Sequence, residues 1–438
     1  MESNTIEGVG RAGEMPNGCS CIQGMAPQFN YQGDVDIETT QVGNFVDKII
    51  PFNGLSSEPY DFVIEPMADY FVDLGSASMY CIYQVVDGDG NALTDEDADV
   101  YPVDNLLSSM WSSIVVKVND VELQPETNKS HPYRAIMEYL LSVERGTNNS
   151  YKSSGYGETD AVRKASFQQK KTGRIDLCGP IALDVLRADH HLSPGNKITL
   201  TFNRADSRFC IMSDAANPKR FQLVIHDVCL YVNRIKLRSS VASSVVGTGS
   251  VPRPTNYFTS HTSVKDYPLA SGTTGATLKL HFGGQLPHQI IIGFVDTAAF
   301  SGRLTADPFK FEPFGLNLAC LKVNGVRVPQ DPLRPDWANG RYSRTYMHLF
   351  QNTGKYRVNA GNGISAEEFA TNKFLIPFDL TPDQCNNFHN HASRTGVIDL
   401  ELGWGVATTQ AISVIAVSVY NQVIQLRGHS VQPVWAKF

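Results

Sequence analysis

Long apolar segments are missing from this chain of 438 residues. A membrane-spanning helix needs about 18 or more consecutive apolar residues. The longest apolar stretch, residues 411–419, is too short for that and favours a strand. We therefore expect no membrane span.

Positive charge is also scarce, because 37 lysines and arginines face 44 aspartates and glutamates, for a formal net charge of −7. Binding along phosphate backbones requires clusters of lysine and arginine. This excludes a protein whose whole surface grips nucleic acid. We expect no sequence-specific nucleic-acid partner.

The 8 cysteines are few and scattered. The first residues show no basic and then apolar run of the kind that begins a secreted chain. We therefore expect reduced thiols in a cytosolic or nuclear setting. The cysteines are Cys19, Cys21, Cys81, Cys178, Cys210, Cys229, Cys320 and Cys385.

Motifs that carry catalysis are absent: GxSxG, HExxH and the P-loop do not occur. Residues 8–13 match GxGxxG, but no strand precedes them and no amphipathic helix follows, which favours a terminal arm over a dinucleotide site. The acidic stretch 87–99 begins like a calcium-binding EF-hand loop, yet Ala92 and Ala98 replace the required glycine and glutamate. We predict no catalytic residue and no cofactor.

Four histidines raise the question of a metal site, since neighbouring histidines in loops can converge on zinc. No cysteine or carboxylate spacing completes a ligand set, so solvated loop histidines are the favoured interpretation and no metal is predicted. The four are His190, His191, His389 and His391.

What the chain does contain is the pattern of a β protein. Hydrophobic residues make up 42% and aromatic residues 10%, which is typical of globular proteins, and the length favours two or three domains. Short runs of Val, Ile, Tyr and Phe bounded by turn residues predict strands. These runs cover residues 61–65, 80–86, 113–118, 197–202, 221–237, 277–282, 289–295, 397–402 and 412–426.

One segment has the period of a helix. In residues 131–145, Ile136, Tyr139, Leu140 and Val143 share a face, and Pro132 suits a first turn. Residues 239–254 are small, polar and rich in glycine and proline, so they predict a boundary between two bodies of similar size.

The two bodies repeat each other in three places, in the same order. VKVNDVEL (116–123) matches LKVNGVRV (321–328), and Asn-Asp or Asn-Gly predicts a type I′ hairpin turn in each. Arg134 and Met137 match Arg344 and Met347. KITLTF (197–202) matches VIDLEL (397–402), and each is followed by a long apolar strand that ends in NRIKL (233–237) or NQVIQL (421–426).

A unit of this size with about eight strands predicts a jelly roll, in which two facing sheets bury one face of each strand. Duplication then gives two tandem jelly-roll β-sandwiches with short helices in inserted loops, an all-β fold. Two unrelated β domains remain the alternative.

Longer segments resemble a known family, the double jelly-roll (hexon-like) major capsid proteins, in particular those of Polinton/Maverick elements and adintoviruses. The resemblance covers residues 45–426 and is most specific in FGGQLPHQIIIGFVDTAAFSG (282–302) and DPFKFEPFGLNLACLKVNG (307–325). It also includes YDFVIEPMADYFVDLGSASM (60–79), HPYRAIMEYLLS (131–142), GRIDLCGPIALDV (173–185), HLSPGNKITLTFNR (191–204) and FLIPFDLTPD (374–383).

The resemblance implies a non-enzymatic virion protein, a homotrimer in which six jelly rolls make a pseudo-hexagonal capsomer of an icosahedral capsid, assembled in the host cytoplasm or nucleus. Implied partners are further copies of the chain, penton proteins and minor capsid proteins. Outer loops are expected at residues 88–105, 146–172, 206–220 and 330–363. The expected division is an arm (1–44), a first jelly roll (45–240), a linker (241–256), a second jelly roll (257–428) and a tail (429–438).

Aromatic residues near these loops are the candidates for trimer contacts, each weighed against a role in the subunit core. They are Trp111, Trp337, Tyr342, Tyr346, Phe350 and Tyr356. Two other functions stay open: a jelly-roll protein that binds carbohydrate or a receptor, and a cupin-like metalloenzyme, for which the expected histidine and glutamate cluster is missing.

Overall fold

Alternation of apolar and polar residues sets the strands of this protein. In β8 (Ile198–Arg204), Ile198, Leu200 and Phe202 are fully buried, and the residues between them are half-buried. Successive side chains of a strand point to opposite faces, so one face of β8 enters a core. The computed structural model describes residues 39–55, 58–124, 128–143, 149–188, 190–216, 218–246, 254–281, 283–357, 362–384, 391–427 and 430–435.

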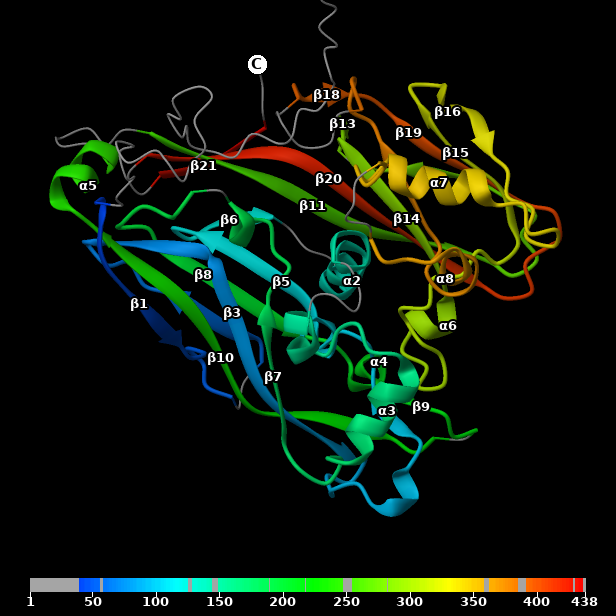
Figure 1. Ribbon diagram of the computed structural model, residues 1–438, viewed down its shortest axis with the longest axis horizontal. Coiled ribbons are helices and arrows are strands. Elements are labelled where there is room, and N and C mark those ends of the chain that lie inside the picture. Colours follow the sequence, from blue (N-terminus) through cyan, green and yellow to red (C-terminus); the bar gives the residue numbers. More distant parts are fainter. Residues whose placement is uncertain are drawn as a thin grey trace, which may run out of the picture.

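The first half of the chain forms two antiparallel four-stranded sheets that face each other (Figure 1). One sheet runs in the order β1 (Gln41–Ile49), β10 (Phe221–Leu237), β3 (Tyr70–Asp87) and β7 (Ile175–Pro180). The other runs in the order β2 (Tyr60–Ile64), β8, β5 (Trp111–Val118) and β6 (Val121–Gln124).

The second half repeats this arrangement. One sheet runs in the order β11 (Thr255–Leu269), β20 (Ile412–Arg427), β14 (Gln289–Asp296) and β17 (Leu375–Asp379), with β21 (Ser430–Trp435) also paired to β20. The other runs in the order β12 (Gly275–Leu280), β19 (Ile398–Trp404), β15 (Leu316–Val323) and β16 (Val326–Leu333).

The two halves have one topology. If the eight main strands of each half are numbered in chain order, the sheets of both halves run 1-8-3-6 and 2-7-4-5. This is a jelly roll, in which strand pairs wind from one sheet to the other. The fold is therefore two tandem jelly rolls, as the sequence predicts, and among the described residues each main sheet takes its strands from one half.

The repeated hairpins lie at the same place in both halves, between strands four and five. Asn119 and Asp120 have φ of 47° and 65°, and Asn324 and Gly325 have φ of 50° and 84°. Positive φ at both central residues is the type I′ signature. The predicted turns are confirmed.

Aromatic rings fill the space between the sheets of the first sandwich. The ring centroid of Phe202 lies 5.2 Å from that of Phe62 and 5.1 Å from that of Trp111, in edge-to-face arrangements. Burial of each such side chain stabilises the fold by about 1.5–3 kcal/mol. The core residues on β8 and β10 are buried throughout: Ile198, Leu200, Phe202, Leu223, Ile225, Val228 and Leu230.

Some boundaries differ from the sequence expectation. β1 begins at Gln41, inside the expected arm, because its backbone pairs with β10 from Gln41 opposite Leu237. Residues of the expected linker form helix α5 (Ser239–Val246). The helix expected at 131–145 is α2 (Ser130–Ser142), with Pro132 in its first turn.

The stretches expected as loops contain short regular elements. In the first half these include η2 (Asp95–Asp97), β4 (Val100–Pro102), η3 (Asn149–Ser154), α3 (Asp160–Gln168) and β9 (Ile211–Ser213), and β4 pairs with β9. In the second half, the expected loop 330–363 contains α7 (Ser343–Gln351), and α8 (Ala366–Thr371) follows it.

Candidate functional site

Helix α2 of the first sandwich is held against the second sandwich, and this contact is the joint between the two halves (Figure 1). The ring of Tyr133 stacks on that of Phe300, with centroids 5.6 Å apart, at the end of α6 (Thr297–Phe300). Edge contacts bring Tyr133 to Phe309 at 5.8 Å and to Phe311 at 6.4 Å. A residue of the first half is therefore part of the core of the second.

Beside this ring, Met137 packs on the backbone of β14. A Cβ added at Gly293 would lie 2.6 Å from Cε of Met137 and 2.8 Å from Cδ1 of Phe311. Real Cβ atoms do not approach so closely, so glycine is needed there for the helix to reach the strand.

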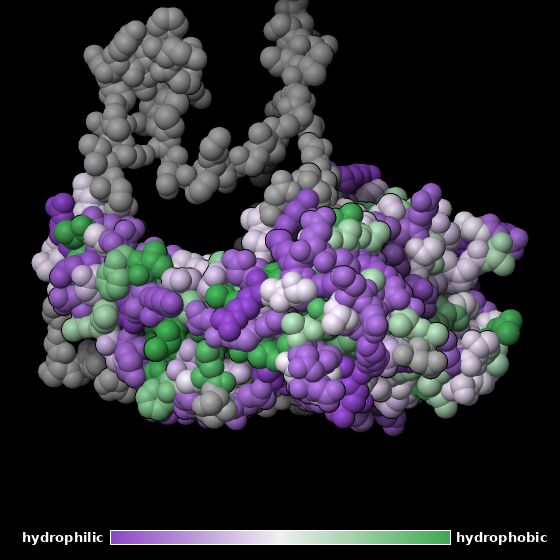
Figure 2. Space-filling view, turned by 90° about the horizontal axis from the view of Figure 1, so that it is seen from below, coloured by the Kyte–Doolittle hydropathy of each residue, from purple (hydrophilic) through white to green (hydrophobic). Residues whose placement is uncertain are grey.

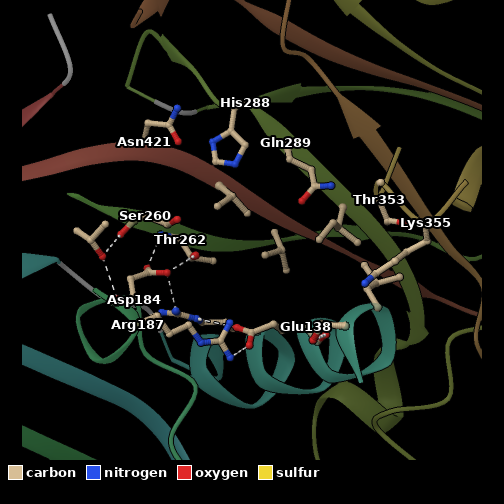
Figure 3. Close-up of a pocket in the computed structure, with 18 of the residues that line it drawn as sticks. Glu138, Asp184, Arg187, Ser260, Thr262, His288, Gln289, Thr353, Lys355 and Asn421 are labelled. Carbon is tan, nitrogen blue, oxygen red and sulfur yellow. Dashed lines mark hydrogen bonds and ion pairs between the residues drawn. The ribbon is translucent and has the colours of Figure 1, made fainter. Parts of the chain in front are cut away.

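Asp184 connects the two halves through polar contacts (Figure 3). It accepts a hydrogen bond from Nη2 of Arg134 at 2.7 Å, and others from the backbone N and Oγ1 of Thr262 in β11 at 2.8 and 3.0 Å. Its backbone oxygen accepts a further bond from Oγ1 of Thr259. Arg134 and Asp184 are both buried, and the cost of desolvating both groups offsets much of the attraction within such a pair.

A cleft of about 560 Å³ opens between α2 and the sheet of β11, β20 and β14. Figure 3 shows Arg187 and Glu138 on its helical side, where they form an ion pair, and His288 and Lys355 on the opposite side. Burial lowers the pKa of His288 to about 4, so its ring is neutral at pH 7. The two carboxylates of the cleft, Glu138 and Asp184, are each paired with an arginine of the first half.

The histidines and acids considered as metal ligands have other surroundings. No cluster of three or more ligating side chains occurs among the described residues. His191 lies 3.4 Å from Asp73, and His391 lies 3.2 Å from Asp383. His190 is exposed, and His389 lies outside the described residues.

The acidic stretch 87–99 serves local structure. Asp87 accepts hydrogen bonds from the backbone N of Asp89 and Asn91, and Asp97 accepts from that of Thr94. Asp99 lies 2.9 Å from Nζ of Lys164. The GxGxxG match and the Cys19, Cys21 and Cys385 thiols lie outside the described residues.

The described cysteines, Cys81, Cys178, Cys210, Cys229 and Cys320, are free thiols. Burial raises the pKa of Cys81 and of Cys210 to about 12, so both stay protonated and unreactive at neutral pH. No helix in the described part of the chain combines the length and the apolar character needed to cross a bilayer.

The structure separates Trp111 from the other aromatic candidates. Only 1% of Trp111 is exposed, and it packs on Tyr60 and Phe202 inside the first sandwich. Trp111 is therefore a residue of the subunit core and not a trimer contact, since a side chain enclosed by its own sandwich presents no surface to a neighbour.

The remaining candidates lie on the second sandwich around α7. Trp337 stacks on Tyr342 at 5.2 Å, and Tyr346 meets Phe350 at 5.0 Å, all four half-buried. Phe369 of α8 lies between these pairs, 6.4 Å from Trp337 and 5.3 Å from Tyr346. Tyr356, after α7, is exposed.

Sequence reasoning did not assign the joint. The matched Arg134 and Met137 were visible as half of a repeat, but their contacts with Asp184 and Gly293 were not. No periodic pattern in the sequence marks Asp184 or Thr262. The two residues pair with each other across the two halves, far apart in the chain.

No protein-family model matches the sequence. A protein of Caenorhabditis elegans, "Uncharacterized protein F54H12.2", is 22% identical over 353 residues, which cover 77% of this chain and 84% of that protein.

Solved structures match over nearly the full length. A chain of the Sputnik virophage superposes with a TM-score of 0.61 at 12% identity, covering 97% of this chain and 94% of its own. The mavirus major capsid protein gives a TM-score of 0.55 at 10% identity and 97% coverage of both chains. The Faustovirus major capsid protein gives 0.53 at 10% identity, covering 89% of this chain and 92% of its own. The fold is thus shared with viral major capsid proteins.

Proposed function

We propose that this chain is a major capsid protein, a structural and non-enzymatic subunit that forms homotrimers and, from them, an icosahedral virion shell. The observation that carries this proposal is the match over 97% of both chains to the mavirus major capsid protein. This coverage includes both sandwiches of the chain.

The mechanism is assembly by mass action. Two similar sandwiches in each chain give six in a trimer, and six similar bodies around a threefold axis tile a lattice with few distinct contacts. Apolar and aromatic side chains near the surface would be buried between copies, and such anchors supply most of the binding energy of an interface. The candidates on this chain are Trp337, Tyr342, Tyr346, Phe350 and Tyr356.

We place the chain in the Polinton/Maverick and adintovirus group. The support is the resemblance of residues 282–302 and 307–325 to that group, together with the animal relative, since an element integrated in a host genome leaves its protein among the host's own. Penton and minor capsid proteins are the proposed further partners, and the virion, assembled in the host cytoplasm or nucleus, is the proposed location.

The proposed division of the chain is an arm (1–44), a first jelly roll (45–240), a linker (241–256), a second jelly roll (257–428) and a tail (429–438), with the first strand of each jelly roll beginning slightly earlier, at Gln41 and at Thr255. Its support is that, in the described residues, no main sheet contains strands of both halves.

Light scattering of the purified protein, followed by negative-stain imaging of the same peak, tests the proposal. We expect a mass three times the chain mass of 48.2 kDa and a pseudo-hexagonal outline. A persistent monomer that retains a glycan or a metal would overturn the proposal and support a binding module instead.

A further inference from the structure

The two repeated helices have opposite surroundings. Both follow the repeated hairpin, and Arg134 and Met137 of α2 match Arg344 and Met347 of α7. Met137 is fully buried, whereas Met347 is 44% exposed. The Arg134 side chain is 3% exposed, whereas that of Arg344 is 54% exposed.

This difference extends along one whole face. Of the α2 residues that face the second sandwich or its cleft, Glu138 and Ser142 are not buried, but four others are, and the counterparts of these four on α7 are exposed. The pairs are Tyr133 and Ser343, Arg134 and Arg344, Met137 and Met347, and Leu141 and Gln351. The opposite face of each helix packs on its own sandwich, with Tyr139 and Leu349 buried at matching positions. Helix α7 therefore has one face for its own sandwich and one that nothing described in this chain covers.

The surface that would complement α7 can be located through the sequence repeat. Asn421 of β20 pairs with Ser260 of β11, at the edge of the cleft, and its counterpart Asn233 of β10 pairs with Val46 of β1. Val46 is 65% exposed. Ile50, just after β1 and an even number of residues from Val46, is also exposed, whereas Phe45, next to Val46 in the strand, points to the opposite face of the sheet. Figure 2 shows apolar side chains gathered on the left of the face seen from below, where β1, β10 and β3 run.

The two surfaces differ at the third strand. Asp296 and Asp87 end the third strands opposite the first residues of the eighth, so Gly293 of β14 corresponds to the larger Gln84 of β3. Since Met347 has the size of Met137, which packs on Gly293, α7 would lie farther from β3 than α2 lies from β14.

We propose that α7 of one copy seats on the β1–β10–β3 face of a second copy and repeats between chains the joint that α2 makes within one chain. This inference rests on the proposed self-assembly and specifies its surfaces. The contact is heterologous, because two different surfaces meet, so each chain uses its α7 in one contact and its β1 face in another. Residues 1–38, which precede β1, are the alternative occupant of that face.

Two single substitutions test the contact, one on each surface: Met347→Glu and Val46→Glu. Both side chains are exposed in the single chain, so far-ultraviolet circular dichroism and thermal unfolding should match the wild type. Because each change puts a charge into the proposed contact, the dissociation constant of the assembly should rise by at least about tenfold in either variant. Val406→Glu, at another exposed valine, is the matched control and should leave the assembly intact.

Mixing the two variants identifies the kind of contact. A Val46→Glu chain keeps its α7 and a Met347→Glu chain keeps its β1 face, so a one-to-one mixture should form a dimer through one intact contact, although neither variant does so alone. Assembly that survives both substitutions, with the wild type still trimeric, would overturn this inference and leave the proposed function standing. If only Val46→Glu acts, and removal of residues 1–38 reproduces its effect, the chain's own arm occupies the face. A monomeric wild type would overturn both proposals.

Discussion

At the scale of single residues, Gly293 lies where a helix of one sandwich meets a strand of the other. Most glycines in strands weaken them, because glycine loses more backbone entropy on folding than other residues do. Here the missing side chain leaves room for Met137 and Phe311. The residue that looks weakest in its strand is thus required by the joint.

We predict that Gly293→Ala destabilises the protein by about 1–3 kcal/mol, because overpacking outweighs the gain in strand propensity. Urea unfolding would measure the loss. Gly275→Ala is the matched control, since a Cβ there meets only the Leu402 carbonyl oxygen at 3.6 Å and should be nearly neutral. The double variant with Met137→Ala should lose less than the two single losses added together. Equal stabilities of Gly293→Ala and Gly275→Ala would contradict this account.

His348 in α7 is a second residue whose environment sets its chemistry. Its ring packs on Phe378, and Nδ1 lies 3.0 Å from the amide Nδ2 of Asn352, which donates to the neutral ring. Burial lowers its pKa to about 4. In the unfolded chain, a histidine has a pKa of about 6.5.

The free energy of unfolding should therefore fall as the pH falls through a defined window. Between about pH 6.5 and about pH 4, His348 takes up a proton in the unfolded chain but not in the folded chain. The stability that this residue contributes is fully present above about pH 6.5 and is lost as the pH falls to about 4. The loss from this residue is at most about 3 kcal/mol. His348→Gln should flatten the dependence of unfolding free energy on pH in this window, and an unchanged slope would refute the assignment.

At the scale of elements, the two repeated hairpins differ by one residue in the turn. Asp120 holds a φ of 65° that Gly325 adopts without steric cost. Its ion pair with Lys197, 3.6 Å away, is solvent-exposed and contributes little.

Asp120→Gly should therefore stabilise the protein by up to about 1 kcal/mol, and Gly325→Asp should destabilise it by a similar amount. Thermal unfolding of the two variants beside the wild type would show shifts of opposite sign. Shifts of the same sign would mean that the turns are not equivalent.

Elements with a strong local pattern could be predicted, and elements defined by contacts between the halves could not. β10 was predicted at its exact bounds, because its apolar residues face a core on one side. β11 was missed, since polar residues such as Ser260 and Thr262 lie on its outer face, where Asp184 binds Thr262. For α2 the sequence predicted one buried face, but the second sandwich buries the other as well.

At the scale of the whole molecule, the internal repeat was enough to predict the architecture, because it implied two copies of one unit. How the copies contact each other could not be predicted. The joint depends on Asp184, whose partners lie 50 and 78 residues away in the chain, and no local pattern encodes such a pairing.

Asp184→Ala should separate the unfolding of the two sandwiches. Removing the carboxylate leaves the buried Arg134 with only Glu138, 4.0 Å away, as a charge partner, so the loss should approach the about 3–5 kcal/mol of a broken buried pair. We expect one calorimetric transition in the wild type to split or broaden in the variant, with limited proteolysis near residues 239–254. Asp331→Ala, which breaks the exposed pair with Arg344, is the control and should keep a single transition. A sharp transition at the wild-type temperature in Asp184→Ala would show that the sandwiches are coupled by other contacts.

The α2 joint has a consequence for how assembly responds to dilution. Its two sides are tethered in one chain, so their effective concentration is fixed, on the order of millimolar for short linkers, however dilute the protein is. In a closed ring of three chains, joints within a chain would alternate with joints between chains. Only the joints between chains would depend on the protein concentration in the cell. Three particles would have to meet to close the ring, half the number needed if the six sandwiches were separate chains.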